Sequence, residues 1–364
     1  MKKGEYILSN NRISWLDMSR GISIIFVVIV HSMLNQLKQQ LFYFLIPEIF
    51  GTLAMGVCIF ISGWVFEFSS KKYSEHKLKT TGNKFCRLMI PYFAFSAINY
   101  TIIVIATKIP ALASIAQMGS SDYSQLSLPN FLYQTITYQN STSRNLWFLY
   151  MLFLLNVLHI FLPKLMKNPI VTVVLFCLPV LQNTFELPVL LNYFCAYAGF
   201  FSLGRIAVSY EEKLFSVKKS VYTVIAILFL ISAIVMNTLK FYGVFTGMAS
   251  YAFIPVKFIL VIGGIFTICC GCKFLEGTKA DNIFTFFGRR SMEIYLMHFP
   301  FITQGSTALI LKMFASVPPI FACIVGIILG LAIPVLVSDF VIKKIPLLSF
   351  ILLGSKMKKR AVKK

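Results

Sequence analysis

Apolar runs of about 20 residues recur along this chain from end to end, and each could cross about 30 Å of hydrocarbon as an α-helix. Only 13% of the 364 residues are charged, against about a quarter in a typical soluble domain, and the mean hydropathy is +0.78. The sequence therefore predicts an all-α, polytopic membrane protein with about ten transmembrane helices. The expected spans are 15–36, 45–68, 88–107, 146–163, 169–187, 188–208, 220–239, 250–272, 291–311 and 319–342.

The distribution of charge predicts the orientation of these spans. The net charge is +21, and most of the 34 Lys and Arg residues lie in segments on the same side as the amino end. By the positive-inside rule, both ends are cytoplasmic. The basic excess is then expected to meet anionic membrane lipid, and nucleic acid is not an expected partner. Segments on the outer side hold Lys38, Lys108, Arg144, Lys240 and Lys312, while Arg20 and Lys257 lie within spans.

The pattern indicates a single integral-membrane domain over residues 1–364, with short cytoplasmic tails at 1–14 and 343–364 and no cleavable signal peptide. The longest outer segment, 109–144, either caps an outward-facing pocket or is a plain connector. The cysteines have no accompanying ligands at metal-binding spacing, so no metal site is expected.

Two ionisable residues share one face of the first expected span. Arg20 and His31 are eleven positions apart, which is about three helical turns, or roughly 16 Å along the axis. Ionisable side chains inside a bilayer are costly and usually mark a functional site. The spacing therefore makes Arg20 and His31 the first candidates for catalytic residues.

Each of the two residues also has a simpler explanation. Asp17 precedes Arg20 by three positions, so the two can form an ion pair at the cytoplasmic interface. His31 lies near the outer end of the span, where an interfacial histidine needs no function. Their shared face favours function, but spacing alone leaves both explanations open.

Three further candidates lie in later spans, each with two explanations. Ser62, in Ile61-Ser62-Gly63, either allows close helix packing or contacts substrate. Arg87 ends a basic segment that either sets topology or binds the phosphates of a nucleotide-bearing donor. Trp147, at the start of the fourth span, belongs either to an aromatic belt or to a surface that stacks on sugar.

The ninth span carries a polar stripe. Ser291, Tyr295 and His298 recur at positions i, i+4 and i+7, so they share one helical face. His298 is either a second intramembrane functional imidazole or a satisfied structural histidine. Glu293 lies off the stripe and is expected to pair with Arg289 or Arg290.

Together these motifs resemble the acyltransferase 3 family of integral-membrane O-acyltransferases, and the opening segment is similar to fucose-4-O-acetylase-like members. The motifs follow the family's order over residues 15 to about 300. They are Trp15-Leu-Asp-Met-Ser-Arg-Gly21 with the Arg20-to-His31 spacing, Ile61-Ser-Gly63, Arg87-Leu-Met-Ile-Pro-Tyr92, Leu146-Trp-Phe-Leu149, and Gly288-Arg-Arg-Ser291 through Tyr295 and His298.

The resemblance implies that an acetyl group moves from cytosolic acetyl-CoA to a hydroxyl of a cell-surface polysaccharide or its lipid-linked precursor, in the cytoplasmic (inner) membrane of a bacterium. It implies that Arg20 holds a CoA phosphate or polarises the thioester. It implies that His31 exchanges a proton with the attacking hydroxyl or forms an acetyl-histidine. The expected substrate-binding residues are Asp17, Ser62, Arg87, Trp147, Ser291, Tyr295 and His298.

A different class of function fits the same residues. Polar stripes inside a helical bundle also mark the pathways of transporters. A transporter or flippase for a glycolipid or small solute is therefore the alternative. A purely structural membrane protein fits poorly, because structure alone does not require Arg20 and His31 inside a span.

Overall fold

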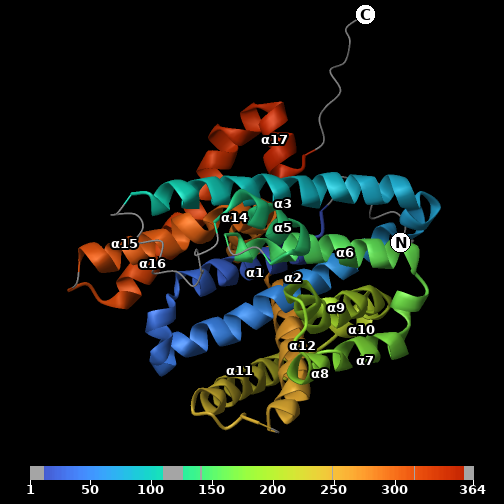
Figure 1. The fold of residues 1–364 in the computed structure, drawn as a ribbon. Helices are drawn as coiled ribbons and strands as arrows, with labels where there is room; N and C mark the ends of the chain where they lie inside the picture. Colours follow the sequence, from blue (N-terminus) through green and yellow to red (C-terminus); the bar gives the residue numbers. More distant parts are fainter. Residues whose placement is uncertain (1–11, 110–125, 140–141, 248, 315, 356–364) are drawn as a thin grey trace, which may run out of the picture. The chain divides into compact units, whose positions relative to one another are not determined.

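The computed structural model describes residues 12–109, 126–139, 142–247, 249–314 and 316–355 (Figure 1). Helices make up 86% of the structure, and these ranges contain no strand. Nine helical segments within them are long and apolar enough to cross a membrane. The all-α, polytopic class is therefore confirmed, while the cytoplasmic placement of the two ends stays a prediction.

The expected span 169–187 is where the structure departs most from the sequence pattern. It forms two short helices, α7 (Pro169–Cys177) and α8 (Val180–Thr184). Pro179 lies between them, and a proline inside a helix removes a backbone donor and clashes with the preceding turn. The apolar stretch Pro169–Gln182 covers about 21 Å as a helix, short of the roughly 30 Å that a span needs.

The chain divides into two compact units. The first consists of residues 1–77 and 155–291, and the second of residues 78–154 and 292–364. Helix α6 (Trp147–Phe161) begins in the second unit and ends in the first. The single-domain organisation expected from the sequence stays a prediction.

Close backbone packing organises the first unit. Helix α1 packs on α13 and α2, and α2 packs on α9. A Cβ atom on Gly288 would lie 1.8 Å from the carbonyl oxygen of Asp17, and one on Gly21 would lie 1.9 Å from that of Phe284. Only glycine allows this approach of α1 to α13. The unit's long helices are α1 (Ser14–Ser32), α2 (Leu41–Glu75), α9 (Val189–Ala207), α11 (Lys219–Phe241), α12 (Ala249–Leu275) and α13 (Lys279–Arg289), with short α10 (Glu211–Phe215) after α9.

The second unit contains the polar end of the ninth expected span. Helix α14 is followed by a kinked segment, His298–Ile302, in which Phe299 has an extended, non-helical backbone (φ −120°, ψ 147°). The span Ser291–Met313 is therefore interrupted just after Met297. The unit's helices are α3 (Lys77–Thr107), α5 (Leu128–Thr137), α14 (Ser291–Met297), α15 (Thr303–Met313), α16 (Pro319–Phe340) and α17 (Pro346–Leu353), the last within the expected carboxyl tail.

The long segment 109–144 is described only in part. Within it, α5 is tied to α3 by two tyrosines, because the Tyr92 hydroxyl donates to the Thr135 carbonyl (2.6 Å) and the Tyr100 hydroxyl donates to the Leu126 carbonyl (2.7 Å). Residues 110–125 and 140–141 lie outside the described residues. The described part of this segment is thus held on α3 by hydrogen bonds, and a cap over a pocket stays a prediction.

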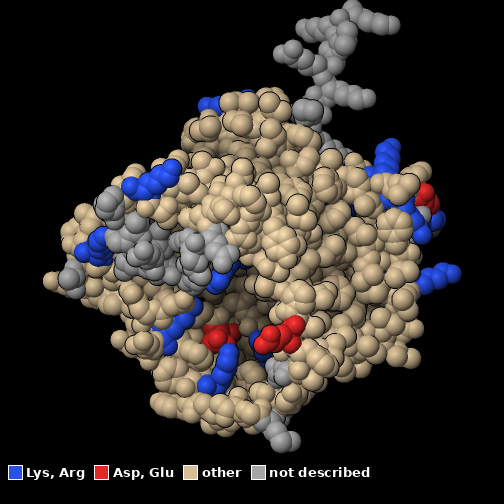
Figure 2. Space-filling model, in the orientation of Figure 1, with Lys and Arg blue, Asp and Glu red and all other residues tan. Residues whose placement is uncertain are grey.

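The exterior has the character expected of a lipid-facing surface. On the face drawn in Figure 2, most atoms belong to residues other than Lys, Arg, Asp and Glu. On α11 only 11% of the most apolar stretch is buried, and Val224, Leu228 and Ile231 are each more than half exposed. In water such a surface would be an association site. In a bilayer it is the ordinary outer face of a span.

Candidate active site

Three arginines surround the carboxylate of Asp17 at the start of α1. Asp17 Oδ1 lies 3.5 Å from Arg20 Nη1, and Oδ2 lies 3.5 Å from Arg12 Nη1 and 3.6 Å from Arg289 Nε. The Asp17 side chain is buried (7% exposed), whereas Arg12 and Arg289 are 62% and 55% exposed. The pair of Asp17 and Arg20 predicted from their spacing is therefore confirmed.

The Asp17 cluster, meaning Asp17 with Arg12, Arg20 and Arg289, carries a net charge of about +2, because guanidinium groups stay protonated. Its ion pairs are longer than the 2.7–2.9 Å typical of charge-assisted hydrogen bonds. The two exposed guanidiniums can therefore turn toward an anionic ligand. Spacing along α1 could not reveal Arg289, which reaches Asp17 because α13 packs on α1 at Gly288.

His31 lies half-buried in the last turn of α1, at the opposite end from the Asp17 cluster. About three helical turns, or roughly 16 Å, separate it from Arg20 along the axis. The structure therefore keeps the two predicted catalytic residues on one helix but not in contact. They can act together only on a ligand that extends along α1, or on one that moves between them.

On α2, the residues nearest the Asp17 cluster have mostly local partners. Cys58 lies within electrostatic range of Arg20. One turn later, the Ser62 hydroxyl donates to the Cys58 carbonyl within the same helix (2.7 Å). A Cβ on Gly63 would meet the Phe201 carbonyl at 2.0 Å, so this part of α2 packs directly on α9. Ser62 thus has a hydrogen-bond partner within its own helix, and Gly63 allows α2 to pack closely on α9. Both residues are explained without a substrate.

In the second unit, Arg87 and Trp147 occupy different environments. Arg87 is exposed on α3, and its backbone contacts Gly354, the left-handed residue that ends α17. Trp147 is buried at the start of α6, with its ring 6.2 Å from that of Phe148. A buried indole does not fit a simple interfacial belt, and sugar stacking by Trp147 stays a prediction.

The polar stripe of the ninth span is partly confirmed. Ser291 and Tyr295 lie on α14, but His298 follows the helix at the start of the kinked segment His298–Ile302. Asn145, which the sequence analysis did not single out, holds Tyr295: the Tyr295 hydroxyl donates to the Asn145 carbonyl, and Asn145 Nδ2 lies 3.4 Å from the Tyr295 carbonyl. The Tyr295 hydroxyl therefore has a structural partner.

The contacts of His298 define its tautomer. Its Nδ1 lies 2.8 Å from the Ile294 carbonyl and 3.0 Å from the Tyr295 carbonyl. A carbonyl oxygen can only accept, so Nδ1 carries a proton and Nε2 is the basic nitrogen of the neutral ring. The ring is fully buried. These backbone contacts support the structural explanation of His298 without testing a role in binding.

One predicted ion pair is wrong. Glu293 was expected to bind Arg289 or Arg290, but its Oε1 lies 2.7 Å from Lys343 Nζ. Lys343 also binds Asp339 at 2.7 Å, so one ammonium bridges two carboxylates. The expectation failed because the partner lies 50 positions further along the chain, where sequence spacing gives no information.

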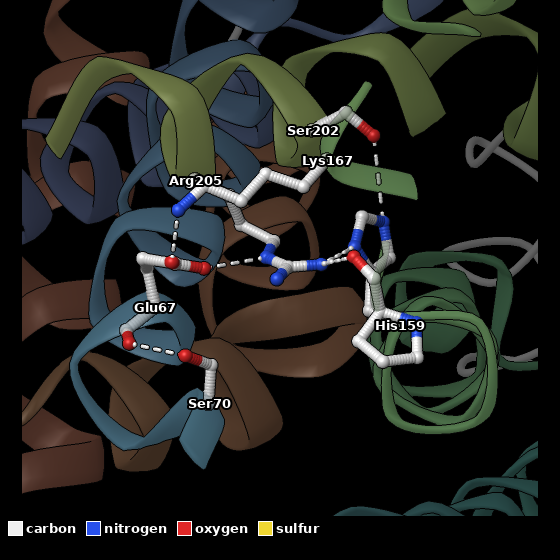
Figure 3. A network of polar contacts seen from close by, with 7 residues as sticks. Glu67, Ser70, His159, Lys167, Ser202 and Arg205 are labelled. Carbon is white, nitrogen blue, oxygen red and sulfur yellow. Dashed lines mark hydrogen bonds and ion pairs between the residues drawn. The ribbon is translucent and has the colours of Figure 1, made fainter. Parts of the chain in front are cut away.

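A buried charge network, which we call the Arg205 network, lies elsewhere in the first unit. Figure 3 shows Arg205 between Glu67 and His159. The Arg205 side chain is 2% exposed; its Nε donates to Glu67 Oε2 (2.9 Å) and its Nη1 to His159 Nδ1 (2.9 Å). Lys167 binds the other oxygen of Glu67, and His159 Nε2 lies 3.5 Å from the Ser202 hydroxyl.

The Arg205 network joins α2, α6 and α9. Because a guanidinium can only donate, His159 Nδ1 accepts and the ring proton lies on Nε2, facing Ser202. Sequence spacing alone singles out none of these residues as a site. Glu67, an acidic residue at the end of an apolar span, is the signal that could have found the network.

A carboxylate at the start of α13 also holds α1. Asp281 accepts hydrogen bonds from the Ser14 hydroxyl, from the Thr285 hydroxyl (2.8 Å) and from the Gly277 amide (2.9 Å). The bond from Ser14 is the main cause that lowers the pKa of Asp281 below its usual value. The ionised carboxylate therefore stabilises the fold above the unfolded-state pKa, and this contribution is lost as the pH falls through the folded-state pKa.

We expect an Asp281→Asn variant to be less sensitive to acid than the wild type. Its thermal midpoint should fall less between about pH 5 and pH 3, because the variant has no carboxylate to protonate. Fluorescence-detected unfolding in detergent measures this midpoint, with the exposed Glu212→Gln as a control for the loss of one negative charge. Equal acid sensitivity of Asp281→Asn and wild type would contradict the role given to Asp281.

The fold and these charged groups define a multi-pass α-helical membrane protein with ionisable residues held at both ends of its first span. The family model described as an acyltransferase domain matches residues 13–339, so the chain belongs to the acyltransferase 3 family. Comparisons with curated proteins and with solved structures gave no match. The match includes every candidate site residue predicted from the sequence and identifies the chain as a membrane acyltransferase.

Proposed function

We propose that this membrane acyltransferase moves an acetyl group from cytosolic acetyl-CoA to a hydroxyl of a cell-surface polysaccharide or its lipid-linked precursor, in the cytoplasmic membrane of a bacterium. The observation that carries the proposal is the arrangement of α1. The Asp17 cluster lies at one end of this helix and His31 at the other. Such a helix suits a reaction whose donor and acceptor approach from opposite sides of the membrane.

The Asp17 cluster is suited to the donor. Coenzyme A is rich in phosphate groups, and arginine is the side chain best matched to phosphate, because its planar fork makes two parallel hydrogen bonds. The net charge of about +2 and the exposure of Arg12 and Arg289 favour an anionic ligand. The positive-inside pattern predicts a cytoplasmic position for this end of α1, on the side where acetyl-CoA is made. Arg87 is a further candidate for a donor phosphate.

His31 is suited to the proton transfers of the reaction. An imidazole titrates near neutral pH, so it can accept the proton of the attacking hydroxyl. The new carbon–oxygen ester bond forms as the carbon–sulfur bond of the thioester breaks, and the leaving thiolate takes the proton back. An acetyl-histidine intermediate would divide the same transfer into two steps. Neither route requires a metal.

The remaining candidates are proposed to contact the acceptor or to hold the residues that do. Tyr295 and His298 are buried and fixed by backbone contacts, so they fit a rigid wall better than a mobile group. Trp147 provides an aromatic face for the C–H surface of a sugar ring. The structure gives the least support to substrate binding by Ser62 and Ser291. The Ser62 hydroxyl donates within its own helix, and Ser291 is the first residue of α14.

An assay with purified protein in liposomes tests the proposed reaction against transport. With acetyl-CoA outside and a hydroxyl-bearing glycan as acceptor, we expect covalent acetyl transfer that stops when acetyl-CoA is omitted. Radiolabelled acetyl counted in the glycan is the measurement. Movement of an unmodified solute or glycolipid without acetyl-CoA, and with no label in the glycan, would favour the transporter instead.

Substitution of Arg20 tests donor binding separately from the transfer reaction. We expect Arg20→Lys to raise the KM for acetyl-CoA by about tenfold, because lysine keeps the charge but loses the planar fork. The dependence of the initial rate on acetyl-CoA concentration measures this change. Arg144→Lys, an exposed arginine outside the Asp17 cluster, is the matched control. An unchanged KM in Arg20→Lys would mean that Arg20 only anchors α1 through Asp17.

A further inference from the structure

A pocket lies at the junction of α2, α11 and α12 in the first unit. Its lining combines the apolar Phe229 and Phe253 with the polar Glu48, Thr52, Asn237 and Lys257. None of its lining residues comes from α1 or α13. The pocket is therefore separate from the Asp17 cluster, and the proposed transfer reaction gives it no role.

Positive charge exceeds negative charge around this pocket. Glu48 Oε2 binds Lys240 Nζ at 2.6 Å, and Lys38 and Lys257 also lie within electrostatic range of the same carboxylate. Three ammonium groups thus surround one carboxylate. Within the described part of the chain, Lys257 makes no hydrogen bond or ion pair. The excess of positive charge around the pocket favours an anionic ligand over a cationic one.

The position of Lys257 favours an anionic ligand beside it. It lies eight residues into α12, roughly 12 Å from the start of a membrane-spanning helix. An ammonium at this depth is costly unless it is paired, and lysines inside spans usually have an anionic partner. Glu48 already binds Lys240 through Oε2, so a bound anion would give Lys257 an ionic partner of its own.

The surroundings of the pocket indicate where this molecule comes from. The apolar floor is tightly packed: a Cβ on Gly264 would lie 2.5 Å from Leu53 and 2.9 Å from the Phe229 ring. On the two helices that line the pocket, α12 exposes Ile259 (70%) and Ile262, and α11 exposes Ile231 and Ile234. A ligand with an anionic head and apolar chains would match both surfaces.

We propose that this pocket binds the phosphate of a membrane lipid. The Lys257 ammonium and the Thr52 hydroxyl donate hydrogen bonds to phosphate oxygens, and the acyl chains lie along the exposed faces of α11 and α12. Lysine binds phosphate as a point charge and needs no fixed geometry. Lipid binding at this pocket does not depend on acyl transfer, so it can fail while the proposed reaction stands.

Native mass spectrometry of the detergent-purified chain tests the proposal, with phosphatidylglycerol as the probe. We expect Lys257→Met to weaken its binding by about tenfold or more, because a charge-assisted hydrogen bond is lost. Lys312→Met removes an exposed lysine near the end of another span and should bind like the wild type. Size-exclusion profiles of both variants check folding, and Lys257→Arg, which keeps the charge, should retain binding.

Competition experiments distinguish the source of the phosphate. Diacylglycerol of the same chain length lacks the phosphate and should not displace phosphatidylglycerol. Inorganic phosphate lacks the chains and should displace it only at far higher concentration. The proposal is overturned if Lys257→Met binds phosphatidylglycerol as the wild type does, if diacylglycerol competes equally, or if inorganic phosphate competes at the same concentration as lipid.

Discussion

Replacing His31 by alanine is expected to lower the rate of acetyl transfer by about 10²- to 10⁴-fold, while the protein still accumulates in the membrane. The reason is that the attacking hydroxyl loses the group proposed to take its proton, whereas His31 lies in the last turn of α1, where truncation leaves the helix intact. Labelled acetyl counted in the acceptor glycan, normalised to the amount of membrane protein, measures the loss.

The control for this variant is His76→Ala, which removes an exposed histidine at the end of α2. It should keep wild-type activity. The pH profile adds a second readout. Wild-type activity should fall on the acid side as the imidazole protonates, and any residual activity of His31→Ala should lack that limb. Persistence of the acid limb in His31→Ala would assign the base to another residue.

The second large effect is on stability. We expect Glu67→Gln to lower the free energy of unfolding by about 3 kcal/mol or more, because the Arg205 guanidinium is 2% exposed and would lose its anionic partner. The remaining bonds of Arg205, to His159 and to the Pro163 carbonyl, carry no negative charge. Thermal unfolding in detergent, followed by size-exclusion recovery after heating, measures the change.

An exposed pair provides the matched control. Glu276 binds Lys273 at 2.7 Å, with side chains 28% and 42% exposed, and also accepts from the Trp15 amide (3.2 Å). Because glutamine keeps that acceptor oxygen, Glu276→Gln should cost no more than about 1 kcal/mol. A double variant, Glu67→Leu with Arg205→Leu, should recover part of the stability, since replacing both charges removes the cost of the unpaired one. If Glu67→Gln is as stable as Glu276→Gln, the Arg205 network does not hold α2 to α9.

The sequence predicted features that depend on local physics. The thickness of hydrocarbon and the need to satisfy every backbone polar group make apolar runs readable as spans. The pair of Asp17 and Arg20 followed from a spacing of three along a helix. The fifth expected span failed because hydropathy does not register the break at Pro179 between two short helices.

Contacts across long sequence separations could not be predicted. Glu67 meets Arg205 across 138 positions, and Arg289 reaches Asp17 only because Gly21 and Gly288 let α13 approach α1. A single sequence contains the glycines and the charges but not the crossing of the helices. The wrong partner assigned to Glu293 has the same cause. The family and the helical class, by contrast, followed from motifs spread along the chain and are confirmed.

Mass spectrometry of surface glycan from cells with and without this chain tests the proposed transfer most directly. We predict that one sugar residue carries an acetyl ester when the chain is present and lacks it when the chain is absent, and that the wild-type sequence restores the ester whereas His31→Ala does not. Identical acetylation of the glycan in the presence and absence of the chain would contradict an O-acetyltransferase acting on surface polysaccharide.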